Sequence, residues 1–110
     1  MRIFATTAYE RAIRKLITDV AREEMESTIA AKPDGSLRIP GTGGIRKLRW
    51  AGSGRGKRGG IRVIYYYSAT LDSVYMLTAY AKADRDDLTP TDKRVLSRLV
   101  AAIKKGGAEG

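Results

Sequence analysis

The stretch Ile61-Arg-Val-Ile-Tyr-Tyr-Tyr67 decides the fold, because its density of β-branched and aromatic residues is typical of a central β-strand. Its side chains alternate between two faces, so Arg62 and Ile64 share one face while Val63 and Tyr65 share the other. A strand of this kind needs partners on both sides. The rest of the fold prediction therefore starts from its neighbours.

Three further strands are predicted, over residues 2–5, 45–51 and 74–80. The first is short and apolar, as suits the edge of a sheet. In the second, Lys47 and Arg49 are two residues apart and so point to the same face. The opposite face of this strand carries Arg46, Leu48 and Trp50.

Helices are predicted on either side of the strands. Residues 7–31 carry an apolar stripe at helical spacing and form either one long helix or, as we expect, an αα-hairpin that breaks near residues 20–22. A last helix begins with Thr89 as its cap and ends at Gly106-Gly107. The predicted order is β-α-α-β-β-β-α. It gives one α+β domain over residues 1–110, with an antiparallel twisted sheet packed against two N-terminal helices and a C-terminal helix.

Positive charge is concentrated in the middle of the chain. Lys and Arg total 21 against 12 Asp and Glu, a net charge of +9, and no acidic residue occurs between Asp34 and Asp72. This imbalance predicts a polyanionic partner, either nucleic acid or an anionic surface. Acidic residues in the first two helices disfavour an anionic membrane. The basic residues of the acid-free interval are Arg38, Arg46, Lys47, Arg49, Arg55, Lys57, Arg58 and Arg62.

Composition excludes several kinds of chemistry. The chain has no Cys and no His, which removes thiolate nucleophiles, imidazole bases and the usual zinc ligands. We therefore expect no metal site and no cofactor. Neither a membrane span nor a signal peptide is recognisable, so we expect a cytoplasmic protein without a membrane partner.

A glycine-rich loop between two predicted strands matches G-x-G-x-x-G at Gly54, Gly56 and Gly59. A dinucleotide-binding motif must open a helix after a strand, which this loop does not do. A P-loop reading also fails, because Ala51 replaces its first glycine and Arg58 its Ser or Thr. We interpret the loop as a basic hairpin suited to phosphate contact.

Four stretches of the chain, in this order, carry a family resemblance: Ile39-Pro-Gly-Thr-Gly-Gly-Ile-Arg-Lys-Leu-Arg-Trp50, Gly54-Arg-Gly-Lys-Arg-Gly-Gly-Ile-Arg-Val-Ile-Tyr-Tyr-Tyr67, Leu77-Thr-Ala-Tyr-Ala-Lys82 and Asp87-Leu-Thr-Pro-Thr-Asp-Lys-Arg94. They resemble the HigB branch of the RelE/ParE toxin superfamily. The resemblance implies the toxin of a type II toxin–antitoxin system, a ribosome-dependent mRNA endonuclease (mRNA interferase) that inhibits translation. It also implies three partners: the ribosome, mRNA and a cognate antitoxin of the HigA type with a helix-turn-helix domain.

The resemblance also implies site residues on the central strands. It matches Arg62, Lys82, Lys57 and Arg49, the predicted catalytic residues, and Lys47, a predicted RNA-binding residue. From the residues themselves we add Arg46, Arg55 and Arg58 as RNA-binding residues, with Tyr66 and Tyr80 as aromatic rings on which bases can stack. The tyrosine that RelE carries beyond its last strand is absent, since that position falls near Leu88-Thr89. This departure disfavours a tyrosine-assisted mechanism.

Cleavage without histidine needs another proton acceptor when the ribose 2′-hydroxyl attacks the adjacent phosphorus. Lys57 or Lys82 is our candidate base, with the carboxylate of Asp84 as the alternative. Arg49 and Arg62 would hold the phosphate oxygens and offset the charge that grows in the transition state. Two other functions stay open: a ParE-like gyrase inhibitor on the same scaffold, and a non-catalytic RNA- or ribosome-binding module.

Overall fold

The structure is a computed structural model that describes residues 1–51 and 60–109. Residues Arg55, Lys57 and Arg58, which the sequence assigns to the site, lie outside the described residues. The elements are β1 (Arg2–Ala5), α1 (Thr7–Leu16), α2 (Asp19–Ala31), β2 (Leu37–Arg38), β3 (Ile45–Trp50), β4 (Ile61–Ser68), β5 (Ser73–Ala81) and α3 (Pro90–Glu109).

The sheet has the strand order β1-β5-β4-β3-β2, which puts β4 in the centre as its composition predicts. Neighbours from β2 to β5 pair antiparallel, but β1 pairs parallel with β5, with Arg2 opposite Ser73 and Ala5 opposite Met76. The predicted α+β fold is confirmed, but the sheet is mixed and not antiparallel throughout, because its β1 edge pairs parallel. The helices α1 and α2 carry the chain away after β1, so β1 is not joined to its partner by a hairpin.

The two N-terminal helices form the expected hairpin, but the break lies at Ile17 and Thr18. Thr18 caps α2 by accepting a hydrogen bond from the Ala21 N–H, at 3.2 Å. Ile17 leaves the helical conformation with φ −141°. The break therefore comes before residues 20–22, at a capping residue that the apolar spacing does not reveal.

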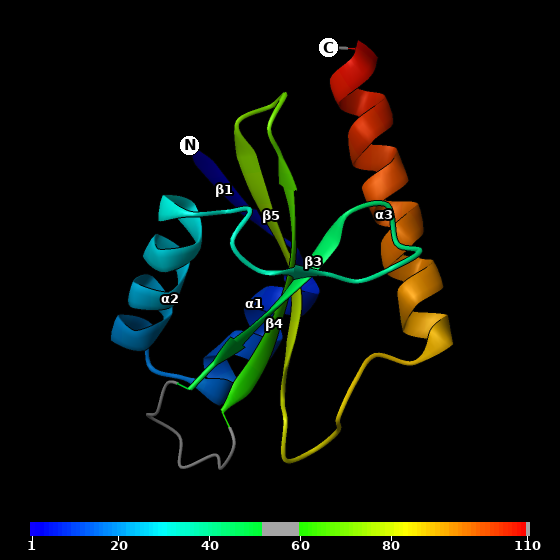
Figure 1. The fold of residues 1–110 in the computed structure, drawn as a ribbon. Coiled ribbons are helices and arrows are strands. Elements are labelled where there is room, and N and C mark those ends of the chain that lie inside the picture. The colour runs from blue at the N-terminus through cyan, green and yellow to red at the C-terminus, as the bar shows by residue number, and fades with distance from the viewer. Residues whose placement is uncertain (52–59, 110) are drawn as a thin grey trace.

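Each face of the sheet packs against different helices, and Figure 1 shows α2 and α3 on opposite sides of the strands. One apolar cluster joins α1 and α2 to the sheet, and the other joins α3 to it. The alternation predicted for β4 is confirmed, since Val63 and Tyr65 belong to the first cluster and Ile64 and Tyr66 to the second.

The C-terminal helix begins with a reciprocal cap. The Thr89 hydroxyl accepts from the Asp92 N–H, and the Asp92 carboxylate accepts from the Thr89 N–H, both at 3.0 Å. Farther along, Lys104 Nζ donates to the Gly43 carbonyl at 2.7 Å, which ties α3 to the loop before β3. The helix continues past the predicted stop at Gly106 to Glu109. Within the described part of the chain, no helix combines the length and apolar character that crossing a membrane requires.

Candidate nucleic-acid interface

Three side chains form a row across the central strands on the face that looks toward α3. Arg49 of β3 lies opposite Arg62 of β4, and Arg62 lies opposite Tyr80 of β5. Directly opposed residues in antiparallel strands point to the same face, with their Cβ atoms about 5 Å apart. Lys47 sits on the same face one pair farther along, opposite Ile64. The structure thus brings together four predicted site residues, and we call Arg49, Arg62 and Tyr80 the central row.

Lys82 joins this group through the backbone. Its N–H donates to the Gly60 carbonyl at 3.2 Å, so the residue after β5 lies beside the start of β4, near Arg62. Gly60 has φ +73°, and a Cβ there would overlap the Trp50 carbonyl oxygen. Only glycine fits this position comfortably. The end of β3, the start of β4 and the end of β5 are therefore held together.

The basic side chains of this surface are not neutralised. Lys47, Arg49, Arg62 and Lys82 form no side-chain hydrogen bond or ion pair with another described residue. Their electrostatic field is consequently available to a polyanion. By contrast, Arg22 on the other side of the molecule contacts two carboxylates, those of Glu10 and Glu26.

Tyr80 is not an open stacking platform. It is only 7% exposed, and the guanidinium carbon of Arg85 lies 4.5 Å from the centre of its ring. Burial raises the pKa of the Tyr80 hydroxyl and the charge of Asp87 raises it further, whereas Arg62 and Arg85 lower it. A base could not stack on the ring while Arg85 covers it.

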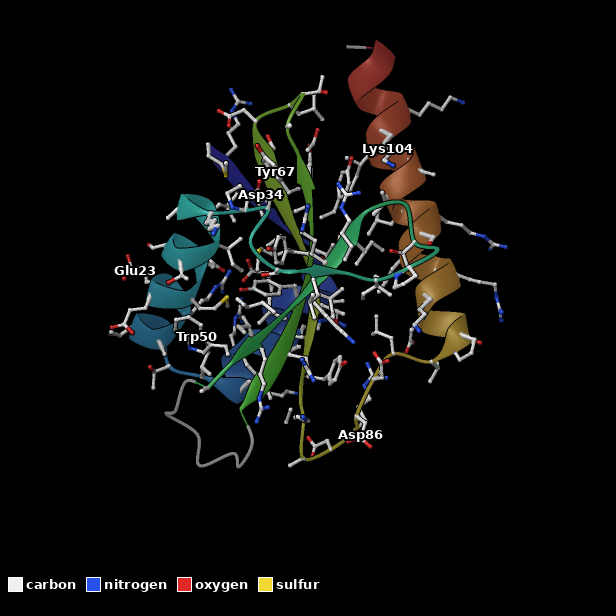
Figure 2. The ribbon with its side chains drawn as sticks, in the orientation of Figure 1. Glu23, Asp34, Trp50, Tyr67, Asp86 and Lys104 are labelled. Carbon is white, nitrogen blue, oxygen red and sulfur yellow. The ribbon has the colours of Figure 1, made fainter. Side chains whose placement is uncertain are left out.

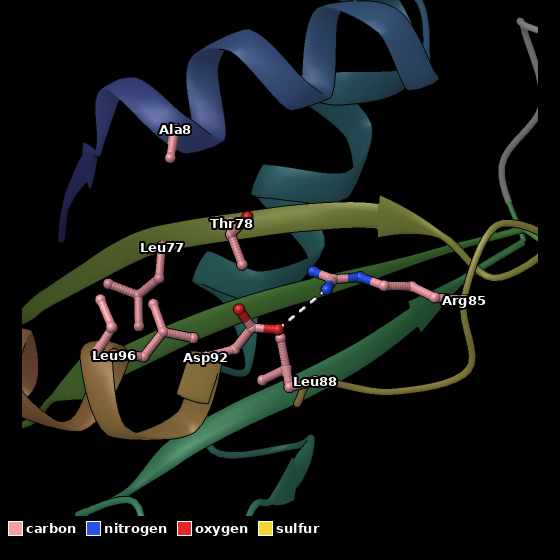
Figure 3. A pocket seen from close by; sticks show the side chains of 8 residues that line it. Ala8, Leu77, Thr78, Arg85, Leu88, Asp92 and Leu96 are labelled. Carbon is pink, nitrogen blue, oxygen red and sulfur yellow. Dashed lines mark hydrogen bonds and ion pairs between the residues drawn. The ribbon is translucent and has the colours of Figure 1, made fainter. Parts of the chain in front are cut away.

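The sequence prediction did not single out Arg85. It stands among Asp84, Asp86 and Asp87, so the local charge gives no sign of a basic site. Arg85 also pairs with Asp92 at 3.0 Å, beside a cavity of about 180 Å³ between β5 and α3 (Figure 3). Only the fold places this arginine over Tyr80.

Two predicted RNA contacts lie apart from the central row. Arg46 points to the opposite face, where its guanidinium donates to the carbonyls of Ser36 at 2.6 Å and Asp34 at 3.2 Å. Figure 2 shows Trp50, which shares that face, on the side of α2. Tyr66 faces α3, but it is 8% exposed and its ring stacks on Tyr75 with centroids 6.2 Å apart.

Taken together, these features define a small α+β protein with an unpaired basic surface on its central strands, a class of surface suited to nucleic acid. A family profile described as the RelE toxin of the RelE / RelB toxin-antitoxin system matches residues 1–109. The chain therefore belongs to the RelE toxin family, the toxin component of a toxin–antitoxin system, which has an antitoxin as its partner.

Several solved structures are similar to the chain. One of them is a crystal structure of the isolated Escherichia coli RelE toxin in its P21 form, with a TM-score of 0.49 and 16% sequence identity. The similarity covers 89% of this chain and 97% of that chain.

Proposed function

We propose that this toxin is a ribosome-dependent mRNA endonuclease that inhibits translation, and that the α3-facing basic surface holds the message. The observation that carries the proposal is the group of Arg49, Arg62, Lys47 and Lys82, brought together by strand register and left without acidic partners among the described residues. A gyrase inhibitor on this scaffold would not need such a group.

The proposed reaction uses the ribose itself as the nucleophile. The 2′-hydroxyl oxygen attacks the adjacent phosphorus, and the bond to the 5′-oxygen breaks as that oxygen takes a proton from solvent water. The products are a 2′,3′-cyclic phosphate and a 5′-hydroxyl end. Arg49 and Arg62 hold the non-bridging oxygens and stabilise the added charge. No metal ion is required, since the nucleophile is intramolecular and the charge is offset by guanidinium groups.

Proton transfer is assigned to Lys82 in this proposal, with the side-chain nitrogen accepting the proton of the 2′-hydroxyl. Asp84 is the alternative acceptor, and it lies two residues beyond Lys82. Lys82→Met and Asp84→Asn separate the two, because only the variant that removes the base should abolish cleavage. The remaining candidate, Lys57, lies outside the described residues.

The ribosome and the antitoxin belong to the same proposal. The isolated toxin presents an open surface, and a ribosome that positions the message can supply the orientation that the reaction needs. We place the toxin in the HigB branch and its antitoxin in the HigA type, on the strength of the four sequence stretches quoted above.

The test is induced expression followed by mapping of mRNA 5′ ends in cells. We expect cuts within translated codons that disappear when translation is blocked, and we expect purified toxin to cleave mRNA bound to ribosomes but not the same mRNA alone. Cuts that persist when translation is blocked would show that cleavage does not depend on the ribosome. Growth arrest without RNA cuts, accompanied by broken DNA, would instead support a gyrase inhibitor, and arrest with neither would support a non-catalytic binder.

A further inference from the structure

The hydroxyl of Tyr80 is a buried polar group with no hydrogen-bond partner among the described residues. Buried hydroxyls in folded proteins are nearly always paired, so an exception in the centre of a candidate site needs a reason. The structure gives Tyr80 a fixed position, opposite Arg62 in the register of β4 and β5. A rigid strand therefore presents an unused donor beside an unpaired guanidinium.

Arg85 covers the ring that carries this donor, and it comes from a less regular part of the chain. It lies between β5 and α3, outside any helix or strand, and its side chain is 41% exposed. Two contacts hold it: the face of the Tyr80 ring, 4.5 Å from its guanidinium carbon, and Asp92, 3.0 Å from its Nη1. Ion pairs as exposed as this one contribute little stability, so an incoming anion can replace Asp92.

Asp92 is held in place independently of Arg85. Its Oδ2 also accepts the hydrogen bond from Thr89 N that caps α3. Figure 3 shows the Arg85 side chain reaching from its loop toward this carboxylate. The carboxylate therefore stays at the start of the helix whether or not Arg85 is bound to it.

We propose that Arg62, Arg85 and the Tyr80 hydroxyl together bind one phosphodiester of the RNA, and that Arg85 exchanges Asp92 for that phosphate. In the resting protein Asp92 retains Arg85 over the ring. When RNA binds, Arg85 turns to the phosphate and the uncovered Tyr80 hydroxyl donates to one of its oxygens. The inference rests on the proposed function, because the anion it requires is the backbone of the message.

The first part of the test measures binding of a short single-stranded RNA with 2′-O-methyl riboses, which cannot be cleaved. Tyr80→Phe removes only the donor and should weaken binding about fivefold, and Arg85→Ala should weaken it by tenfold or more. Arg85→Ala should also lower the slope of log affinity against log salt by about one. Arg98→Ala is the control, an exposed arginine of α3 away from the site.

The second part asks whether Asp92 competes for Arg85. Asp92→Asn keeps an oxygen that can cap the helix but removes the charge, so it should tighten RNA binding about threefold. In an Arg85→Ala background the same change should have no effect, because the competing partner is gone. Thermal unfolding of every variant confirms that it is folded, and Tyr80→Phe should be no less stable than the parent.

Two results would overturn the inference. One is that the Tyr80→Phe and Arg85→Ala variants bind RNA with the same affinity as the Arg98→Ala control. The other is that Asp92→Asn raises the affinity for RNA by the same factor in the parent protein and in the Arg85→Ala background. If the parent protein cleaves mRNA on ribosomes while either result holds, only this inference fails. If the parent protein cleaves no RNA under any condition, the proposed function itself is wrong.

Discussion

The two faces of the sheet differ in whether their polar side chains have partners within the protein. On the α1–α2 face the Tyr9 hydroxyl donates to Glu26 at 2.6 Å, and Arg22 joins Glu26 to Glu10. On the α3 face the Tyr80 hydroxyl has no partner among the described residues and Arg62 pairs with no acid there. The first face pairs Tyr9, Arg22 and their carboxylates internally, although the Trp50 indole N–H has no partner among the described residues, whereas the second leaves a row of charges and a hydroxyl for a ligand.

The largest effect should come from removing Arg62. Arg62→Ala should reduce mRNA cleavage on ribosomes by about 10²–10³-fold, since a donor to the transition state is lost. The free energy of unfolding should change by no more than about 0.5 kcal/mol, because the side chain has no described partner. Toxin-dependent cleavage and urea denaturation measure the two quantities. A variant that loses stability as well as activity would contradict the contrast between the faces.

Truncating a buried side chain on one face and an exposed one on the other should affect stability unequally. Met25 is 0% exposed between α2 and the sheet, so Met25→Ala should cost about 2–5 kcal/mol of unfolding free energy. Leu99 of α3 is 36% exposed, and Leu99→Ala should cost less than about 1 kcal/mol. Urea denaturation of both variants gives the comparison. Equal losses would show that Leu99 is packed as deeply as Met25.

Arg46 and Arg49 are three residues apart on β3 and point to opposite faces of the sheet. Replacing each by Ala therefore compares the two faces with the same residue type. Arg46→Ala should cost about 1 kcal/mol of stability, because its bonds to the Ser36 and Asp34 carbonyls are lost. Its affinity for RNA should be unchanged. Arg49→Ala should do the reverse, weakening RNA binding and lowering the salt slope by about one unit. Anisotropy titrations at several salt concentrations, alongside denaturation, check both.

The smallest effect concerns acid stability. The hydrogen bond from Arg22 holds the pKa of Glu10 below its usual value of 4.5. A lowered pKa stabilises the folded state above pH 4.5, and the benefit is lost as the pH falls through the folded-state value. Glu10→Gln should therefore be less stable than the parent at pH 7, by an amount that shrinks below pH 4.5. Glu23→Gln, an exposed control on α2, should show no such trend.

Alternation predicted which residues of each strand share a face. It put Lys47 and Arg49 on one face of β3 and Arg62 with Ile64 on one face of β4, and the register confirms these groupings and adds that the two faces match. Pairing over long distances was not predictable in the same way. The parallel β1, for example, depends on where the two helices return the chain.

Arg85 shows a different limit of sequence reasoning. Its neighbours in the chain are acidic, while its neighbours in space are an aromatic ring and a helix cap. The net charge of the surrounding sequence therefore gives no sign that Arg85 belongs to a basic site. The same limit applies to Tyr66 and Tyr80, which look alike in the sequence but differ in their basic neighbours. Lys104 of α3 lies beside Tyr66, whereas Arg62 and Arg85 lie beside Tyr80.

The pairing of β1 with β5 has a consequence for the order in which a newly made chain can fold. Thr6 caps α1, and its hydroxyl also donates to the Leu77 carbonyl at 2.7 Å, 71 residues away. The first helix can reach its final place only after residue 77 has been synthesised and is free to pair. Contacts of such long range delay folding. The nascent toxin therefore completes its sheet late in its own synthesis, when most of the chain has already been made.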